Sequence, residues 1–220
     1  MKRSIITTSD GSTTIHLEDW NEQYHSKHGA IQEAYHVFLK QGLFALGSSK
    51  ISILEMGFGT GLNALITYSE AEKKDLSVHY TAVEAFPVPH KELKQLNYIT
   101  QLGNPGLRGV FHKIHTIPWG EEHVLHPFFK LQKLQKDFYE VEDVDKFHLI
   151  YFDAFGPRVQ PELWTERLFR KMYVALKKSG VLVTYSAKGS VRRNLQEVGF
   201  TVERLPGPPG KREMLRALKV

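Results

Sequence analysis

Short apolar runs alternate with amphipathic stretches along most of the chain. Residues 51–56 and 147–152 are nearly continuous apolar runs of strand length, which is typical of strands buried on both faces. Residues 62–73 have helical spacing, and a further apolar run follows at 78–83. Strands that alternate with helices in this way predict an α/β domain with a mostly parallel sheet.

The same alternation continues toward the C-terminus. We expect further helices at 87–96, 161–178 and 190–198, and further strands at 128–135, 181–185, 200–205 and 213–218. The last two strands flank the sequence PGPPG, which predicts a closing hairpin. Residues 32–43 also have helical spacing. We therefore predict an N-terminal extension over residues 1–48 that packs on a single domain at 49–220, and we assign no role to residues 112–127.

Composition excludes several classes of protein. The chain has 220 residues and no cysteine, which rules out disulfide frameworks, thiolate zinc sites and thiol nucleophiles. The eleven histidines lack the spacing of a known metal motif, so no metal is predicted. No secretory signal and no run of about 18 apolar residues is present, so we expect a cytoplasmic protein without a membrane partner. The net charge of +5 is compatible with a polyanionic partner.

A glycine-rich loop joins the first buried strand to the helix at 62–73. Alternate glycines allow a tight turn and let a ligand approach the main chain, while the helix directs its N–H groups to the same point. Leu62 replaces the last glycine of a dinucleotide fingerprint, which disfavours a dehydrogenase, and the Lys-Ser/Thr pair of NTPases is missing. The alternative is a tight turn without a ligand. The candidate cofactor residues here are Glu55, Gly57, Phe58, Gly59, Thr60, Gly61 and Asn63.

Acidic residues end three of the predicted strands. Glu84 is expected to accept hydrogen bonds from ribose hydroxyls, and Asp137 from an adenine amino group, with Phe138 against the ring. Asp153 follows a buried run and is the candidate catalytic carboxylate, which would position an amine and help to remove its proton. Solvated strand ends, and a cap of the following loop by Asp153, are the structural alternatives.

Cations and aromatic residues suggest a nucleic-acid substrate. Tyr24, Phe155 and Trp164 could offer a surface to an unstacked uridine. The cations that could neutralise tRNA phosphates are Lys188, Arg192, Arg193, Lys211 and Arg212. Charged residues are mostly exposed in any protein, so a purely solubilising role for each cation is the alternative.

Several segments together resemble a known family. Residues 55–63 (EMGFGTGLN), 153–157 (DAFGP), 161–164 (PELW) and 211–214 (KREM) resemble the methyltransferase module of the MnmC type, from tRNA 5-methylaminomethyl-2-thiouridine biosynthesis. Residues 24–29 and 33–39 match family segments near the active site, which adds Glu33 to the candidate substrate residues.

The resemblance implies a class I S-adenosylmethionine-dependent methyltransferase, with a Rossmann-like, mostly parallel seven-stranded sheet and a C-terminal antiparallel hairpin strand. It implies N-methylation of the aminomethyl group of a modified wobble uridine in tRNA. The chain ends at residue 220, so we expect no FAD-dependent oxidase domain and a separate enzyme that supplies the aminomethyl substrate. The alternatives are a methyltransferase for a small amine or protein, and a non-catalytic RNA-binding module with a vestigial cofactor pocket.

Overall fold

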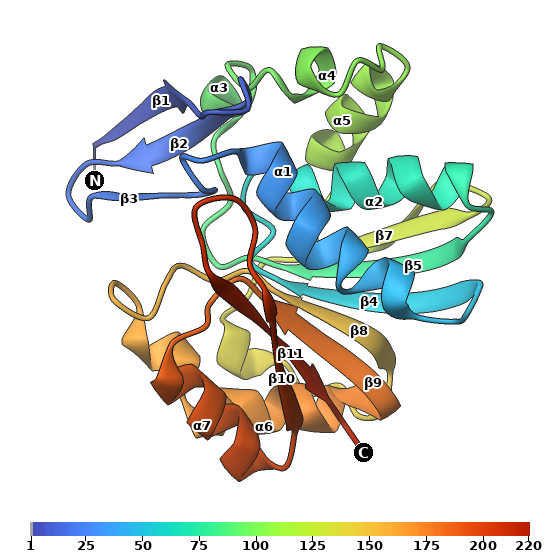
Figure 1. The fold of residues 1–220 in the computed structure, drawn as a ribbon. Coiled ribbons are helices and arrows are strands. Elements are labelled where there is room, and N and C mark those ends of the chain that lie inside the picture. Colours follow the sequence, from blue (N-terminus) through green and yellow to red (C-terminus); the bar gives the residue numbers. More distant parts are fainter. Residues whose placement is uncertain (1) are drawn as a thin grey trace.

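A large twisted sheet forms the centre of the molecule in the computed structural model, which describes residues 2–220 (Figure 1). Among these residues, eight strands pair in the order β10-β11-β9-β8-β4-β5-β7-β6. Strands β9, β8, β4, β5 and β7 run parallel to one another, whereas β6 pairs antiparallel with β7, β11 with β9, and β10 with β11. The prediction of an α/β fold with a closing antiparallel hairpin is therefore confirmed. The predicted count of seven strands was one too low, because β6 adds an edge strand beside β7.

The strands of this sheet have unequal lengths. They are β4 (Lys50–Met56), β5 (Ser77–Val83), β6 (Glu122–His126), β7 (Phe129–Leu134), β8 (Phe147–Phe152), β9 (Leu176–Thr184), β10 (Thr201–Pro206) and β11 (Glu213–Leu218). In β4, Ile53 and Leu54 are both fully buried although they point to opposite faces. Helices cover both faces, which explains why the central strands are apolar at nearly every position.

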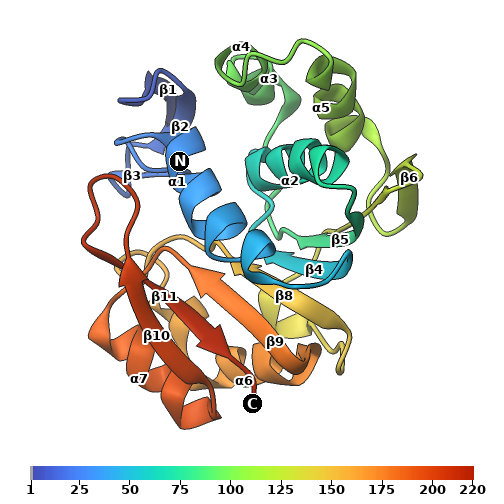
Figure 2. The same ribbon diagram turned by 45° about the vertical axis from the view of Figure 1, so that its right-hand side comes forward.

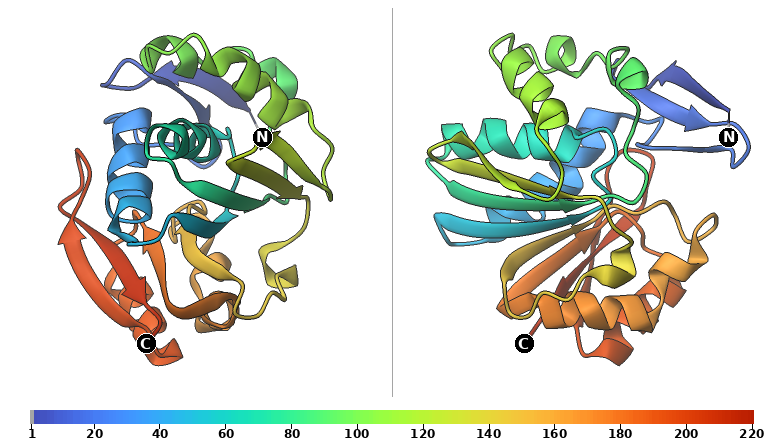
Figure 3. Two further views of the ribbon diagram at one scale, coloured as in Figure 1. Left: turned by 90° about the vertical axis from the view of Figure 1, so that its right-hand side faces the viewer. Right: turned by 180° about the vertical axis from the view of Figure 1, so that it is seen from behind.

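The helices lie on both faces of the sheet (Figure 1). They are α1 (Ala30–Ala34), α2 (Leu62–Lys73), α3 (His90–Leu93), α4 (Tyr98–Gln101), α5 (Leu107–Thr116), α6 (Glu166–Ala175) and α7 (Gly189–Val198). Figure 3 shows α1 and α2 on one face and α6 and α7 on the other. No helix within residues 2–220 combines the length and the apolar character that a membrane crossing requires.

The N-terminal extension contains more regular structure than its sequence pattern predicts. Strands β1 (Arg3–Thr7), β2 (Thr13–Leu17) and β3 (Glu22–Gln23) form a separate antiparallel sheet. Ile15 and Leu17 of β2 pack on Val88 and Leu93 in a small apolar cluster. Helix α1 continues into a π-helical turn, Tyr35–Lys40, whose buried residues join the main core. The boundary between residues 48 and 49 stays a prediction.

One predicted helix was too long. The expected helix at 161–178 is a 3₁₀ turn, Pro161–Trp164, followed by α6, which Thr165 caps by accepting a hydrogen bond from the Leu168 N–H. The helix ends at Ala175, and the next residue, Leu176, already pairs with Phe147 of β8. Competition from the sheet therefore ended the helix before its last polar residues. The predicted helix at 87–96 was also shortened, to the single turn of α3.

Candidate cofactor and active site

The glycine loop turns sharply between β4 and α2. Gly57, Gly59 and Gly61 have φ values of 101°, 49° and 72°, a region that favours glycine. A Cβ atom added at Gly57 would lie 2.6 Å from the main-chain oxygen of Asp153. Only glycine allows the loop to approach the end of β8 this closely. The loop therefore brings the first candidate cofactor residues and the candidate catalytic carboxylate to one place.

Glu84 holds the glycine loop from the end of β5. Its Oε2 accepts a hydrogen bond of 3.0 Å from the Gly59 N–H, and its Oε1 accepts one of 2.9 Å from the Phe86 N–H. A carboxylate has about four acceptor positions, so Glu84 can accept two further hydrogen bonds. Since the side chain also lines the main cavity, it fits a partner with paired hydroxyl groups.

Asp137 and Phe138 follow β7. Asp137 is exposed and caps a 3₁₀ turn, with its Oδ1 accepting a hydrogen bond of 2.8 Å from the Tyr139 N–H. The cap uses one carboxylate oxygen of Asp137 and leaves the other available, so its role toward a cofactor stays a prediction. Phe138 is 7% exposed, and both residues line the cavity. They are therefore placed to contact a ligand that also reaches Glu84.

One cavity of about 800 Å³ connects the predicted residues at the carboxyl ends of the strands. Of the predicted site residues, it is lined by Tyr24, Glu33, Gly57, Phe58, Gly59, Glu84, Asp137, Phe138, Asp153, Phe155 and Lys211. The predicted site residues outside its lining are Glu55, Thr60, Gly61, Asn63, Lys188, Arg192, Arg193 and Arg212. The structure thus brings eleven predicted residues, from seven separate segments, to a single concave site.

Asp153 shares one amide donor with Glu55. The Nδ2 group of Asn63 donates hydrogen bonds of 2.8 Å to Asp153 Oδ2 and 3.0 Å to Glu55 Oε1. Burial, reinforced by the charge of Glu33, raises the pKa of Asp153 to about 7, against the effects of Asn63 and Lys211. Burial and the Asp153 charge raise the pKa of Glu55 well above its usual range. Glu55 is completely enclosed and touches the site through Asn63.

Aromatic side chains form the wall beside Asp153. The Phe155 ring lies edge-on to Tyr24 and Trp20, with centroid distances of 4.9 and 5.6 Å. Trp164 donates a hydrogen bond of 2.8 Å from Nε1 to the Phe155 carbonyl, but the ring is only 3% exposed. The suggestion that Trp164 offers a surface to a base was therefore wrong, because this residue packs in the core behind Phe155.

A salt bridge ties the β10–β11 loop to α1. Lys211 Nζ lies 2.5 Å from Glu33 Oε1, while Glu33 Oε2 accepts a hydrogen bond of 2.8 Å from the Ser26 N–H. The same ammonium group lies 3.9 Å from the centre of the Tyr185 ring. Figure 2 shows this loop extending toward the N-terminal segment. The pair closes the side of the cavity next to Asp153.

The other predicted cations lie on the surface. Lys188, Arg193 and Arg212 are exposed, and Arg192 is half-buried. Lys188 is the N-cap residue of α7. These side chains lie outside the cavity and could contact only a ligand that extends beyond it.

Several lining residues were missed by the sequence analysis. They are mainly from the N-terminal sheet and the segment after it, including Arg3, Trp20, Glu22, His25 and His28. Tyr185 was also missed, although an aromatic residue at the end of a predicted strand was an available signal. Its hydroxyl donates a hydrogen bond of 2.8 Å to the Ala154 carbonyl, next to Asp153.

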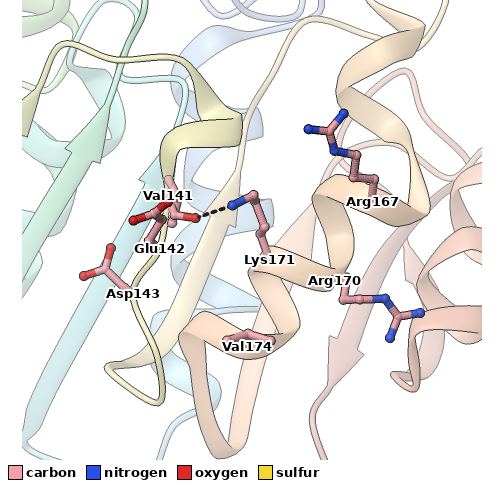
Figure 4. Close-up of a pocket in the computed structure, with 7 residues that line it drawn as sticks. All are labelled: Val141, Glu142, Asp143, Arg167, Arg170, Lys171 and Val174. Atoms are coloured by element: carbon pink, nitrogen blue, oxygen red, sulfur yellow. Dashed lines mark hydrogen bonds between the residues drawn. The ribbon is translucent and has the colours of Figure 1, made fainter.

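A second pocket, of about 480 Å³, lies between α6 and residues 141–143 (Figure 4). Lys171 donates a hydrogen bond of 3.1 Å across it to the Val141 carbonyl. None of the predicted site residues lines this pocket. Within residues 2–220 there is also no group of three side chains suited to hold a metal ion. The chemistry predicted from the sequence is therefore concentrated in the larger cavity.

Comparisons with known proteins agree with this arrangement. Residues 128–220 match a family model described as S-adenosyl-L-methionine-dependent methyltransferase. The tRNA 5-methylaminomethyl-2-thiouridine biosynthesis bifunctional protein MnmC of Hydrogenovibrio crunogenus is 30% identical over 97% of this chain. The chain spans 33% of the length of that curated relative.

Solved structures show the same fold. The crystal structure of MnmC2 from Aquifex aeolicus is 26% identical, with a TM-score of 0.79, over 98% of this chain and 69% of that one. Spermidine synthase from Thermotoga maritima, 16% identical over 99% of this chain and 68% of its own, shares the fold with a TM-score of 0.63. The predicted class I methyltransferase fold is confirmed, and S-adenosyl-L-methionine is the cofactor of the matched family. Over nearly its whole length the chain is similar to the methyltransferase part of MnmC-type proteins, and its residues 128–220 match the S-adenosyl-L-methionine-dependent methyltransferase family.

Proposed function

We propose that the chain transfers a methyl group from S-adenosyl-L-methionine to the amine of a 5-aminomethyl group on a wobble uridine of tRNA. The name of the MnmC relative, which refers to 5-methylaminomethyl-2-thiouridine in tRNA, supports this acceptor. Asp153 carries the proposal, because it is a carboxylate in the main cavity, directly beside the glycine loop.

The cavity residues fit the cofactor. The glycine loop allows a close approach to its main chain, Glu84 has acceptor positions left for ribose hydroxyls, and Asp137 with Phe138 suits an adenine ring. When bound, the cofactor supplies an electrophilic methyl group on a sulfonium. The protein's own part is to hold the acceptor nitrogen in line with that methyl group, and orientation of this kind lowers a barrier substantially.

Asp153 would prepare the acceptor for reaction. A primary amine is protonated near neutral pH and has no free lone pair. Since the pKa of Asp153 is raised to about 7, its carboxylate can take one proton from the bound ammonium group. The neutral amine would then have a free lone pair for the methyl group that the cofactor supplies, and the product would be a secondary ammonium group and a neutral thioether. The aromatic wall of Tyr24 and Phe155 shields this step from water.

The surface cations would hold the nucleic acid. Exposed Lys188, Arg193 and Arg212 can neutralise phosphates outside the cavity, in a chain with a net charge of +5. Uridine must leave its stack to enter a cavity, and Phe155 and Tyr24 offer rings against which a base can lie. We further propose that the aminomethyl group is produced by an enzyme activity outside these 220 residues, and that the reaction takes place in the cytoplasm, where tRNA is found.

The direct test is transfer of a labelled methyl group. The protein is incubated with cofactor labelled on the methyl group and tRNA that carries 5-aminomethyluridine, and the nucleosides are then analysed. We expect label in 5-methylaminomethyluridine, and none in tRNA with unmodified uridine. A folded protein that binds S-adenosylhomocysteine but labels neither tRNA would contradict the proposed acceptor.

Salt dependence separates the acceptor classes. Binding of tRNA should weaken steeply between about 50 and 200 mM salt through release of counterions, by about tenfold for every two phosphate contacts. A small amine acceptor would show little dependence. Flat salt dependence of the Michaelis constant would therefore favour the small-amine alternative over tRNA.

A further inference from the structure

His25 is a buried residue of the main cavity without an assigned role. It follows β3, is only 8% exposed, and lines the cavity. Its Nε2 atom lies 2.7 Å from the Thr60 hydroxyl, which is part of the glycine loop. Its main-chain N–H donates a hydrogen bond of 3.0 Å to the Thr14 hydroxyl. The backbone and one ring nitrogen are thus fixed by the protein.

The hydrogen bonds around Thr60 determine which ring nitrogen carries the proton. The Tyr98 hydroxyl is completely buried and donates a hydrogen bond of 3.0 Å to Thr60 Oγ1, the one acceptor for it among the described residues. The Thr60 hydroxyl has a single proton and no acceptor for it other than His25 Nε2 among the described residues, so we assign this proton to the bond with His25. Burial also lowers the pKa of His25 to about 4, so the ring is neutral. The proton of this neutral ring therefore sits on Nδ1.

The Nδ1–H group opens into the cavity. The Nδ1 atom has no hydrogen-bond partner among residues 2–220. It is also not fully enclosed by protein, because the enclosed side-chain atoms without a partner in that part of the chain do not include it. Because His25 lines the cavity, the accessible atom faces it. A neutral N–H donor held in one orientation suits an acceptor group of a ligand, above all an anionic one.

The strand order indicates which part of the ligand lies there. Glu84 and Asp137 follow β5 and β7, on one side of β4, and would take the adenosine part. Asp153 follows β8, on the other side, and would face the acceptor. His25 lies between them, against the loop after β4. The remaining part of the cofactor, its amino acid end, carries a carboxylate that needs donors.

We propose that the Nδ1–H group of His25, oriented by Thr60, donates a hydrogen bond to the carboxylate of the cofactor's methionine part. This inference rests on the proposed use of S-adenosyl-L-methionine in this cavity. His25 would then contribute to affinity for the amino acid end alone and leave the adenosine end unaffected. The effect is expected to be about tenfold in the dissociation constant, as for a hydrogen bond to a charged group.

Two ligands and two variants test this. Calorimetry measures binding of S-adenosylhomocysteine, and of methylthioadenosine, which lacks the amino acid end. His25→Gln keeps a polar group toward Thr60 but loses the donor at Nδ1, whereas His25→Asn keeps a donor near Nδ1 and loses the contact with Thr60. We expect His25→Gln to weaken S-adenosylhomocysteine about tenfold and methylthioadenosine less than twofold. His25→Asn should weaken S-adenosylhomocysteine less than threefold.

The possible results are distinct. Equal weakening of both ligands in His25→Gln would overturn the inference and assign His25 a structural role in the loop. Unchanged binding of S-adenosylhomocysteine in His25→Gln would overturn it as well. A folded wild-type protein that binds neither ligand would overturn the cofactor site itself, which is a failure of the proposed function rather than of His25. Circular dichroism of each ligand-free variant verifies folding.

Discussion

Replacing Asp153 by asparagine separates its stability effect from its chemical effect. The substitution preserves shape, and the new amide oxygen can still accept the hydrogen bond that Asn63 donates to Asp153. A rise of the pKa from 3.8 to about 7 corresponds to about 4 kcal/mol, at about 1.4 kcal/mol for each tenfold change in the dissociation constant. Because the side chain is only partly buried, we expect its ionisation to change the free energy of unfolding by about 1–3 kcal/mol.

The sign of the effect follows from the order in which the two states lose the proton. Below pH 3.8 the carboxyl group is neutral in both states. As the pH rises toward 7, the unfolded chain loses the proton first, so the wild type becomes less stable relative to Asp153→Asn. Above pH 7 the difference is constant. The carboxylate therefore costs stability at the pH where it is expected to act.

Urea unfolding and turnover measure the two effects. The stability of Asp153→Asn relative to wild type should increase by about 1–3 kcal/mol between pH 4.5 and pH 8.5. Methyl transfer should fall at least about 100-fold, with S-adenosylhomocysteine affinity within threefold. Asp75→Asn, at an exposed turn after α2, is the matched control and should stay within about 0.5 kcal/mol of wild type. A relative stability that does not change with pH, or an unchanged turnover, would refute the reasoning.

Further substitutions test the loop and the salt bridge. Gly57→Ala should lower the free energy of unfolding by about 2 kcal/mol or more and abolish cofactor binding, because its Cβ would meet the Asp153 main chain. In the control Gly47→Ala the Cβ meets nothing within 4 Å, so both stability and cofactor binding should stay unchanged. Denaturation and calorimetry verify this, and a Gly57→Ala protein with normal affinity would contradict it. Lys211→Met should move the acidic limb of the pH–rate profile to higher pH and Glu33→Gln to lower pH, because the lysine lowers and the glutamate raises the pKa of Asp153. Shifts in the same direction would show that these charges do not act on Asp153.

Local sequence patterns were sufficient to predict the central strands and helices of the fold and the site residues that follow strands of the main sheet. The predicted bounds of α2 and β8 match those observed, since strand–loop–helix signals depend on neighbouring residues. Glu84 and Asp153 could be found because the ends of parallel strands meet at one edge of a sheet. Their convergence on one cavity follows from topology that the alternation of elements already indicates.

Long-range contacts account for what the sequence did not reveal. Lys177 and Lys178 favour a helix locally, yet they lie in β9, because Leu176 before them and Val181 after them pair with β8 and this pairing outweighs weak helix propensity. The strands of the N-terminal sheet are at most five residues long and are stabilised by packing on the loop after β5. The Lys211–Glu33 pair joins residues 178 positions apart, which no local pattern can indicate.

Glu55 shows how a correct motif can have a different physical basis from the one expected. Its position before the glycine loop suggested a direct contact with the cofactor, but its side chain is completely enclosed. Asn63 donates to Glu55 and Asp153 at the same time, so the two carboxyl groups are held close together. Two such groups do not both ionise easily. The enclosed Glu55 keeps its proton most firmly, which leaves Asp153, at the cavity wall, as the carboxyl group that can exchange a proton near neutral pH. The acidic residue of the motif thereby belongs to the proton chemistry of the site as well as to its fold.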